Sequence, residues 1–301
     1  MLFVIQGPTA SGKTHAAIDL ALFLGTEIVS ADSRQFYKEM AIGTARPTEI
    51  ELDLVKHHFI GNKSFAEPMN VAEYQVQAER LCQRLLDQFG AVVITGGSSQ
   101  FVDALLYGLD EIPTFKAISN SLVSDLHQHG ISCLGERLKL IDPKAYNTID
   151  VNNPRRVIRA LEVYLGTGRS ITEFQLNNAQ PKFEYMRFFI NWERKLLYDR
   201  INQRVDSMIK DGLEEEVKSL FHYKDSLALN TVGYKEWWDY FEQKVSYDFV
   251  IEKIKQNSRN YAKRQITWSK KYTDKIDLFG DDETPLLQQM LIHIDKSNVV
   301  K

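Results

Sequence analysis

Cysteine is nearly absent, because Cys82 and Cys133 are the only two in 301 residues. Two thiols cannot form a disulfide framework or a zinc site with several cysteine ligands, so we expect a protein of a reducing compartment. The opening apolar run, Met1 to Ile5, is too short for the apolar part of a signal peptide or for a membrane span. We interpret it as a buried strand of a cytoplasmic protein that does not enter a membrane.

An excess of charge of either sign is also absent. Lysine and arginine together number 37 against 40 aspartates and glutamates, which gives a formal net charge of −3. A surface for nucleic acid must therefore be a local patch rather than a property of the whole molecule. The hydrophobic content of 44% is typical of a globular protein. A length of 301 residues favours two domains, or one core with a large insertion.

The first third of the chain alternates short apolar runs with helical patterns. Apolar runs at 2–5 and 91–95 each end in a turn with glycine, and 28–30 is a third candidate strand. Apolar residues with helical spacing separate these runs, at 16–24 and 74–86. Such alternation is typical of buried parallel strands joined by helices, and it predicts a doubly wound α/β core.

Beyond Gly108 the pattern changes. From 112 to 185 we find helical segments and turn signals but no convincing buried strand. The run 187–191 has the pattern of a strand that returns to the sheet, and helical spacing continues to about residue 271. We therefore place the α/β core at 1–109 and 186–275, a helical insertion domain at 110–185, and a surface tail at 276–301.

The most specific motif follows the first strand. Gly7-Pro8-Thr9-Ala10-Ser11-Gly12-Lys13-Thr14 fits the phosphate-loop (P-loop) pattern G-x-x-x-x-G-K-[ST] between a strand and a helix, and predicts a P-loop NTPase-like core. The loop amides and the helix N-terminus would hold a diphosphate or triphosphate. Lys13 would reach the terminal phosphate, and the Thr14 hydroxyl would bind Mg2+. The alternative is an ordinary turn between strand and helix.

Asp32 follows the second candidate strand, at the sheet edge where open α/β folds bind ligands. A carboxylate there could bind a metal through water or accept a proton from a nucleophile, and the structural alternative is an N-cap or an Asx-turn. Ser98 follows the strand at 91–95 and brings a hydroxyl to the same edge.

Further short segments accompany the P-loop and Asp32 along nearly the whole chain. The full set is Gly7–Thr14, Ala31–Gln35, Gly43–Pro47, Gly96–Ser98, Asn153–Arg156 with Arg159–Glu162, Val232–Lys235, and Ala262–Gln265 with Thr267–Trp268. Taken together and in this order, these segments resemble the bacterial tRNA dimethylallyltransferases, of the IPP transferase family. The resemblance implies transfer of a dimethylallyl group from its diphosphate to N6 of adenine 37, beside the anticodon of a tRNA, with Mg2+ as cofactor.

The resemblance also implies roles for single residues. Asp32 would be the general base that accepts the N6 proton, and Ser98, where the family usually has threonine, keeps a hydroxyl for the diphosphate or substrate. Arg194 matches a family arginine and would reach the diphosphate, or it is a solvated helix charge. Asn230 stands where the family commonly has Gln or Arg, and we expect this shorter amide to change recognition of the base in detail.

Two basic clusters are candidates for tRNA contact. Residues 253–271 contain seven cations and no acidic residue, and Lys255, Arg259 and Lys263 share one helix face. The alternative for residues 253–271 is a helix whose charged face is solvated and whose aromatic side chains point to the core. Arg155, Arg156 and Arg159 form the second cluster, with an ion pair to Glu162 as the alternative. The full set expected to bind tRNA is Asp32, Ser33, Arg34, Gln35, Arg46, Arg155, Arg156, Arg159, Asn230, Gly233, Tyr234, Lys235, Arg259, Lys263, Arg264, Gln265 and Trp268.

Three other functions share a P-loop and stay open at this point. A P-loop kinase of small molecules or nucleotides would need ATP and an arginine-rich lid, which the insertion could imitate. An isopentenyltransferase acting on free adenine nucleotides needs no basic, aromatic surface, which argues against it. An RNA-binding ATPase would hydrolyse nucleotide without modifying a base. We expect a monomer.

Overall fold

The computed structural model describes residues 1–174 and 180–296. By internal contacts the chain divides into a core unit, Met1–Tyr107 with Pro181–Lys301, and a second unit, Gly108–Gln180. The insertion predicted from the sequence, at 110–185, has nearly the same bounds as this second unit. Each unit is described by itself below.

The core unit is built on a six-stranded sheet in which every strand pair is parallel, and this confirms the predicted α/β class. The strand order is β3-β2-β4-β1-β5-β6. The central strand β1 is buried over all five of its residues, as a continuous apolar run predicts. The strands are β1 Leu2–Gln6, β2 Ile28–Ser30, β3 His57–His58, β4 Val92–Thr95, β5 Tyr185–Asn191 and β6 Lys275–Phe279.

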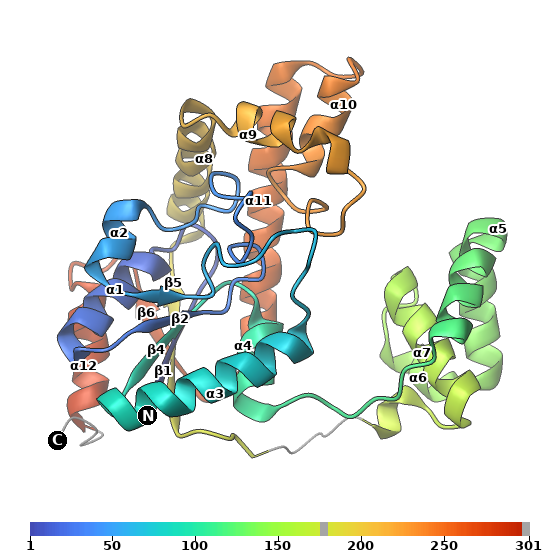
Figure 1. Ribbon diagram of the computed structural model, residues 1–301, viewed down its shortest axis with the longest axis horizontal. Helices are drawn as coiled ribbons and strands as arrows, with labels where there is room; N and C mark the ends of the chain where they lie inside the picture. The colour runs from blue at the N-terminus through green and yellow to red at the C-terminus, as the bar shows by residue number, and fades with distance from the viewer. Residues whose placement is uncertain (175–179, 297–301) are drawn as a thin grey trace. The chain divides into compact units, whose positions relative to one another are not determined.

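Helices cover both faces of this sheet (Figure 1). Alternate residues of β1 point to opposite faces, so Phe3 and Ile5 pack with helix α1 (Lys13–Leu24), while Leu2 and Val4 pack with α3 (Val71–Phe89) and α4 (Ser99–Tyr107). The short helix α2 (Glu49–Leu54) begins at a capping box formed by Thr48 and Glu51.

The expectation of a surface tail at 276–301 is wrong for the part that the structure describes. Strand β6 pairs with β5 at the sheet edge, and α12 (Leu286–Lys296) packs beside α1. Leu278, Met290 and Ile294 are buried. A five-residue edge strand between charged residues gives only a weak apolar signal, which explains why the sequence did not reveal it.

The remaining helices of the core unit gather beyond one end of the sheet (Figure 1). They enclose a separate apolar cluster that includes Tyr37, Met40 and the fully buried Trp237. The helices are α8 Arg194–Lys210, α9 Leu213–Ser219, α10 Trp238–Phe241 and α11 Tyr247–Ser269, with short 3₁₀ turns η2 at Phe221–Tyr223 and η3 at Lys235–Trp237.

In its described residues, 108–174 and 180, the second unit consists of helices joined by loops and has no strand. Helix α7 begins at Pro154, and the Asn153 side chain caps it by accepting hydrogen bonds from two backbone amides. The elements are α5 Lys116–Ile141, which is broken at Gly130, α6 Pro143–Thr148, α7 Pro154–Thr167 and the turn η1 Ile171–Glu173. Across the described ranges of both units, no helix is long and apolar enough to cross a membrane.

Candidate functional site

The P-loop connects β1 to α1, as its motif requires. Gly7 and Gly12 both have positive φ, and Gly12 leads directly into the first turn of α1. A Cβ on Gly7 would come within 2.7 Å of the Ser11 Oγ, so only glycine fits at the start of the loop. The Lys13 Nζ donates to the Pro8 carbonyl at 2.8 Å, which folds the side chain back over the loop.

Two arginines of α8 accompany the P-loop, and the sequence analysis missed their role. The Arg200 Nε donates to the Ala10 carbonyl at 2.9 Å, and its guanidinium lies 4.2 Å from the centre of the Trp192 ring. The charge of Arg204 repels that of Lys13 and attracts that of Asp32. Their i, i+4 spacing on α8 was a visible signal of a shared face, but only the tertiary fold brings that face to the loop.

Burial, together with a neighbouring arginine, changes the titration of the P-loop lysine. Burial, with a smaller contribution from Arg204, lowers the pKa of Lys13 from 10.5 to about 8, although Asp32 acts in the opposite direction. Lys13 is therefore charged below about pH 8, and a bound phosphate would extend its protonated form to higher pH.

Arg194 lies apart from this group. Its Nε donates to the Tyr198 hydroxyl at 3.2 Å, in a hollow whose lining includes Asn202 and Arg259 and no residue of the P-loop. A contact between Arg194 and a diphosphate stays a prediction, to which this placement gives no support.

Asp32 is held by the turn that was its structural alternative, since its Oδ1 accepts from the Arg34 amide at 3.1 Å. The Ser98 Oγ in turn accepts from the Ser33 amide at 3.1 Å and shares a hydrogen bond with the Ser33 hydroxyl at 3.0 Å. Ser98 thus orients the turn next to Asp32. It is not among the residues that line the two cavities described next.

Two cavities meet at Asp32. The P-loop cavity, of about 710 Å³, is lined by Ser11 to Thr14 and by Arg200. The α8–α11 cavity, of about 370 Å³, is lined by apolar residues of α8 and α11 and by the loop from Asn230 to Gly233. Seven residues line both cavities: Thr9, Ala10, Asp32, Thr44, Arg204, Met208 and Tyr261.

Helix α11 contributes two side chains at this junction. The Gln265 Oε1 accepts from the Thr9 amide at 2.8 Å, and its Nε2 donates to the Gly97 carbonyl at 3.1 Å. Gln265 is only 7% exposed, so the geometry supports positioning of the P-loop rather than the expected contact with tRNA. Burial, reinforced by the nearby Asp32, raises the pKa of the Tyr261 phenol and keeps it neutral.

A single carboxylate fixes the wall of the α8–α11 cavity. Glu216 of α9 accepts from the backbone amides of Ala41, Ile42 and Gly43 at 2.8–3.0 Å, and from the Tyr234 hydroxyl at 2.6 Å. It therefore ties together two loops that are almost 200 residues apart in sequence. Tyr234 is fully buried, so its expected contact with tRNA also gives way to a positioning role.

Other candidates near this cavity form hydrogen bonds with the backbone of the core unit. The Gln35 Nε2 donates to the carbonyls of Thr44 and Ala45, and the Arg34 Nη1 donates to the Ala228 carbonyl at 3.0 Å. The Arg46 Nη1 donates to the Lys38 carbonyl at 3.2 Å. The exposed side chains on the wall of the α8–α11 cavity are Asn230, Lys235 and Arg264.

The predicted basic face of α11 lies along α8. Lys255 pairs with Asp206 at 2.8 Å, the Arg259 Nη1 donates to the Asn202 Oδ1 at 2.6 Å, and Lys263 lies 6.0 Å from the Tyr198 ring centre. Lys255 and Arg259 thus contact α8, an arrangement that matches neither a free stripe for phosphate nor the solvated face of the alternative. Lys263, Arg264 and Trp268 are the candidates of α11 that remain exposed.

In the second unit, the three candidate arginines of α7 also differ in exposure, since two face solvent and one forms contacts within the unit. Arg155 and Arg156 are exposed at the helix start. Arg159 pairs with Glu162 at 2.9 Å and donates to the Ile112 carbonyl at 2.9 Å. The ion pair that was the structural alternative therefore forms, and Arg155 and Arg156 are left as the solvent-facing pair.

Comparison with known proteins gives a consistent result. The family model described as IPP transferase matches residues 35–272. The tRNA dimethylallyltransferase of Christiangramia forsetii is 43% identical over 285 residues, 94% of each chain, and tRNA dimethylallyltransferase 1 of Bacteroides fragilis is 41% identical over 274 residues, 90% of each chain. The crystal structure of the full-length tRNA isopentenylpyrophosphate transferase from Bacillus halodurans superposes with a TM-score of 0.73 at 35% identity, covering 99% of this chain and 96% of that one.

Proposed function

The chain belongs to the IPP transferase family, and from this premise we propose that it transfers the dimethylallyl group of dimethylallyl diphosphate to N6 of adenine 37 of a tRNA. The relatives that match it over nine-tenths of their length are named for this reaction. The enzyme is thus a prenyltransferase that uses a P-loop to bind a leaving group.

One observation carries the proposal, namely that Asp32 lies on the shared wall of two cavities of different character. The P-loop cavity offers backbone amides and cations, which suit a diphosphate. The α8–α11 cavity offers apolar walls with a few polar groups at its rim, which suit an extruded base. A transfer reaction needs its two substrates to meet at one point, and Asp32 stands at that point.

On the donor side, the loop amides, Lys13, Arg200 and Arg204 would hold the diphosphate. The residues present also fit Mg2+. Within the described residues no group of three or more His, Cys, Asp or Glu side chains is placed to hold a metal ion by itself. Mg2+ at phosphates commonly uses one or two protein ligands together with phosphate oxygens and water. Thr14 lines the P-loop cavity and would supply a hydroxyl ligand. When bound, the ion would help to neutralise the charge that develops on the departing diphosphate.

The reaction itself exchanges one bond for another. The bond between the allylic carbon and the diphosphate oxygen breaks, and its electron pair leaves with the diphosphate. The lone pair of N6 forms the new carbon–nitrogen bond, and the N6 proton passes to Asp32. The adenine amine is a weak nucleophile because its lone pair is delocalised, so a carboxylate that removes its proton as the bond forms has a clear function.

On the acceptor side, tRNA would meet the exposed polar residues at the rim of the α8–α11 cavity and the exposed arginines of the second unit. The former are Arg264, Lys235 and Asn230, and the latter are Arg155 and Arg156. Arginine suits this role, because its guanidinium binds phosphate and stacks on bases.

The test is to incubate the protein with labelled dimethylallyl diphosphate and either unmodified tRNA or AMP, with and without ATP. We expect label on tRNA without any need for ATP. Label on AMP alone would instead identify a prenyltransferase of free nucleotides. Consumption of ATP without label on tRNA would overturn the proposal in favour of a kinase or ATPase. Gel filtration of the same sample checks the expected monomer.

A further inference from the structure

A charged side chain lies inside the sheet of the core unit. Arg187 is the third residue of β5, between Val4 of β1 and Lys275 of β6, and is 1% exposed. Burying a charge in the middle of a parallel sheet carries a large desolvation penalty, and an apolar side chain would avoid it. The position therefore calls for an explanation other than stability.

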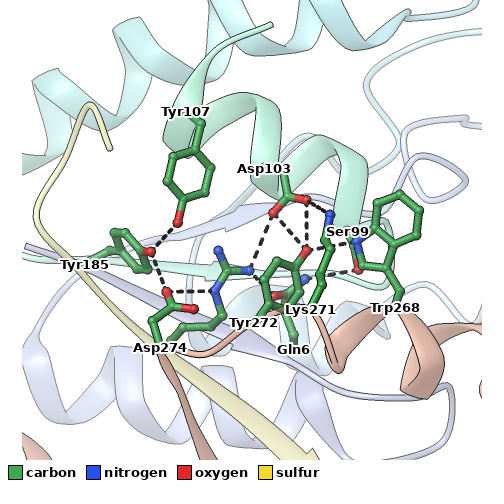
Figure 2. Close-up of polar contacts among 10 residues, drawn as sticks. Gln6, Ser99, Asp103, Tyr107, Tyr185, Trp268, Lys271, Tyr272 and Asp274 are labelled. Atoms are coloured by element: carbon green, nitrogen blue, oxygen red, sulfur yellow. Dashed lines mark hydrogen bonds and ion pairs between the residues drawn. The ribbon is translucent and has the colours of Figure 1, made fainter. Parts of the chain in front are cut away.

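The partners of Arg187 come from three separate parts of the chain. Figure 2 shows the polar contacts of this network, with Gln6, Asp103, Tyr272 and Asp274 labelled. Its Nη1 donates to the Gln6 Oε1 at 2.7 Å and lies 3.6 Å from the Asp103 Oδ1, while its Nε lies 3.5 Å from the Asp274 Oδ2. The Tyr272 ring covers the guanidinium at 3.8 Å. Two carboxylates and a ring thus compensate one buried cation.

Each partner holds a further element in place. Gln6 directly precedes Gly7 of the P-loop, and its Nε2 donates to the Ser99 Oγ at the start of α4 at 3.4 Å. Asp103 of α4 accepts from the Tyr272 hydroxyl at 2.8 Å and from the Lys271 Nζ at 2.8 Å, just beyond the end of α11. One guanidinium therefore joins the end of β1, helix α4 and the end of α11.

The same network continues to the ends of α4 and β5. The Tyr185 hydroxyl donates to Asp274, and it also shares a hydrogen bond with Tyr107 at the last residue of α4 (Figure 2). Helix α4 is thus held both near its first turn and at its end.

These two helices carry the groups that set up the candidate reaction centre. Ser98, one residue before α4, holds Ser33 beside Asp32. Gln265 of α11 holds Thr9 of the P-loop and Gly97. Any shift of α4 or α11 on the sheet would therefore move Asp32 relative to the P-loop.

We propose that Arg187 is a positioning residue for the transfer reaction, which fixes α4 and α11 on the end of β1 and thereby sets the position of Asp32 relative to the P-loop. Arg187 lies behind the site and does not line either cavity. The inference rests on the proposed function, since it concerns the rate of that transfer.

The test compares Arg187→Met with a variant that is destabilised elsewhere on the same face of the sheet. Leu85→Ala on α3 removes a buried side chain from the apolar cluster under α4 without touching the network. Both variants should have a lower Tm. Only Arg187→Met should lose kcat, by roughly tenfold to 100-fold, because small misplacements of reacting groups have effects of that size. Its KM for both substrates should stay within about threefold of wild type, since both cavities are intact.

A second variant, Gln6→Met, removes the same link without leaving a buried charge unpaired, and it serves if Arg187→Met does not fold. If Arg187 acts through Gln6, the double variant should lose kcat no further than Arg187→Met alone, within about twofold. Normal kcat in Arg187→Met or in Gln6→Met, or an equal loss of kcat in Leu85→Ala, would overturn the inference. Absence of transfer by the wild type would instead count against the proposed function.

Discussion

The two cavities that meet at Asp32 are built in different ways. The P-loop cavity takes seven consecutive lining residues, Thr9 to His15, from one segment, and other segments complete its wall. The α8–α11 cavity is assembled from at least four segments, which Glu216 and other side chains tie together. A phosphate site can be encoded locally because amides are present in every residue, whereas a pocket for a base needs side chains that converge from distant positions.

Asp32 belongs to both cavities, so its replacement should have the largest effect. We expect Asp32→Asn to lower kcat by about 100- to 10,000-fold, because general-base catalysis is lost while the shape is kept. Steady-state transfer of label to tRNA measures this. The binding of each substrate, measured separately, should be nearly normal. Near-normal turnover of this variant would show that Asp32 is not the general base.

The donor side can be disturbed through a side chain that sequence reasoning missed. Arg204→Met should lower kcat/KM for dimethylallyl diphosphate by roughly 100-fold, since one cation that stabilises developing charge is lost. Arg194→Met serves as the matched variant on the same helix, and its expected change is below about twofold because its charge is exposed and lies apart. A large loss of kcat/KM in Arg194→Met with little change in Arg204→Met would instead show that Arg194 contacts the diphosphate.

The acceptor side can be disturbed without touching the P-loop. Glu216→Gln should lower kcat/KM for tRNA by roughly tenfold, because the neutral amide accepts more weakly from three backbone amides and brings two unwanted donors. The affinity for dimethylallyl diphosphate should stay within about twofold of wild type. Glu215→Gln, an exposed neighbour on α9, is the control. Equal losses for both substrates would show that the two cavities are not independent.

The smallest expected effect is a change with pH in the affinity for dimethylallyl diphosphate, the donor substrate. In the free protein the pKa of Lys13 is about 8, so Lys13 is charged below that pH and loses its proton above it. A bound diphosphate favours the charged form, hence affinity for dimethylallyl diphosphate should fall as pH rises, by roughly fivefold between pH 7.5 and 9. The phosphate itself is fully ionised well below this range, as its last pKa is about 6.

Titration calorimetry at several pH values measures this fall, together with the uptake of a proton. Lys13→Arg should abolish the pH dependence, because the guanidinium does not titrate there. An unchanged pH profile in that variant would assign the effect to another group. Affinity for tRNA anticodon stem-loops should not follow the same curve.

The same contrast explains what the sequence could predict. The P-loop, Asp32 and four of the strands are encoded in short contiguous patterns, and the structure has these elements where the patterns predicted them. The two-residue strand β3 is too short to give a period, and β6 alternates weakly among charged residues. Gln265, Tyr234 and Glu216 act through backbone atoms of loops far along the chain, so no spacing in the sequence reveals their partners.

Charge patterns were the least reliable guide to the site. Lys255, Arg259 and Lys263 share a helix face, as their spacing predicted, but α8 presents Asp206, Asn202 and Tyr198 to that face. A periodic stripe of cations shows only that the residues are neighbours. Whether they meet phosphate or a second helix depends on the packing of the whole unit.

The most direct test of the central claim is a structure of the protein with a tRNA anticodon stem-loop and a dimethylallyl diphosphate analogue whose bridging oxygen is replaced by sulfur. The account predicts diphosphate on the P-loop and adenine in the α8–α11 cavity. It also predicts that N6 lies about 2.6–3.2 Å from an Asp32 carboxylate oxygen. An adenine bound elsewhere, or an Asp32 out of reach of N6 with both substrates in place, would contradict it.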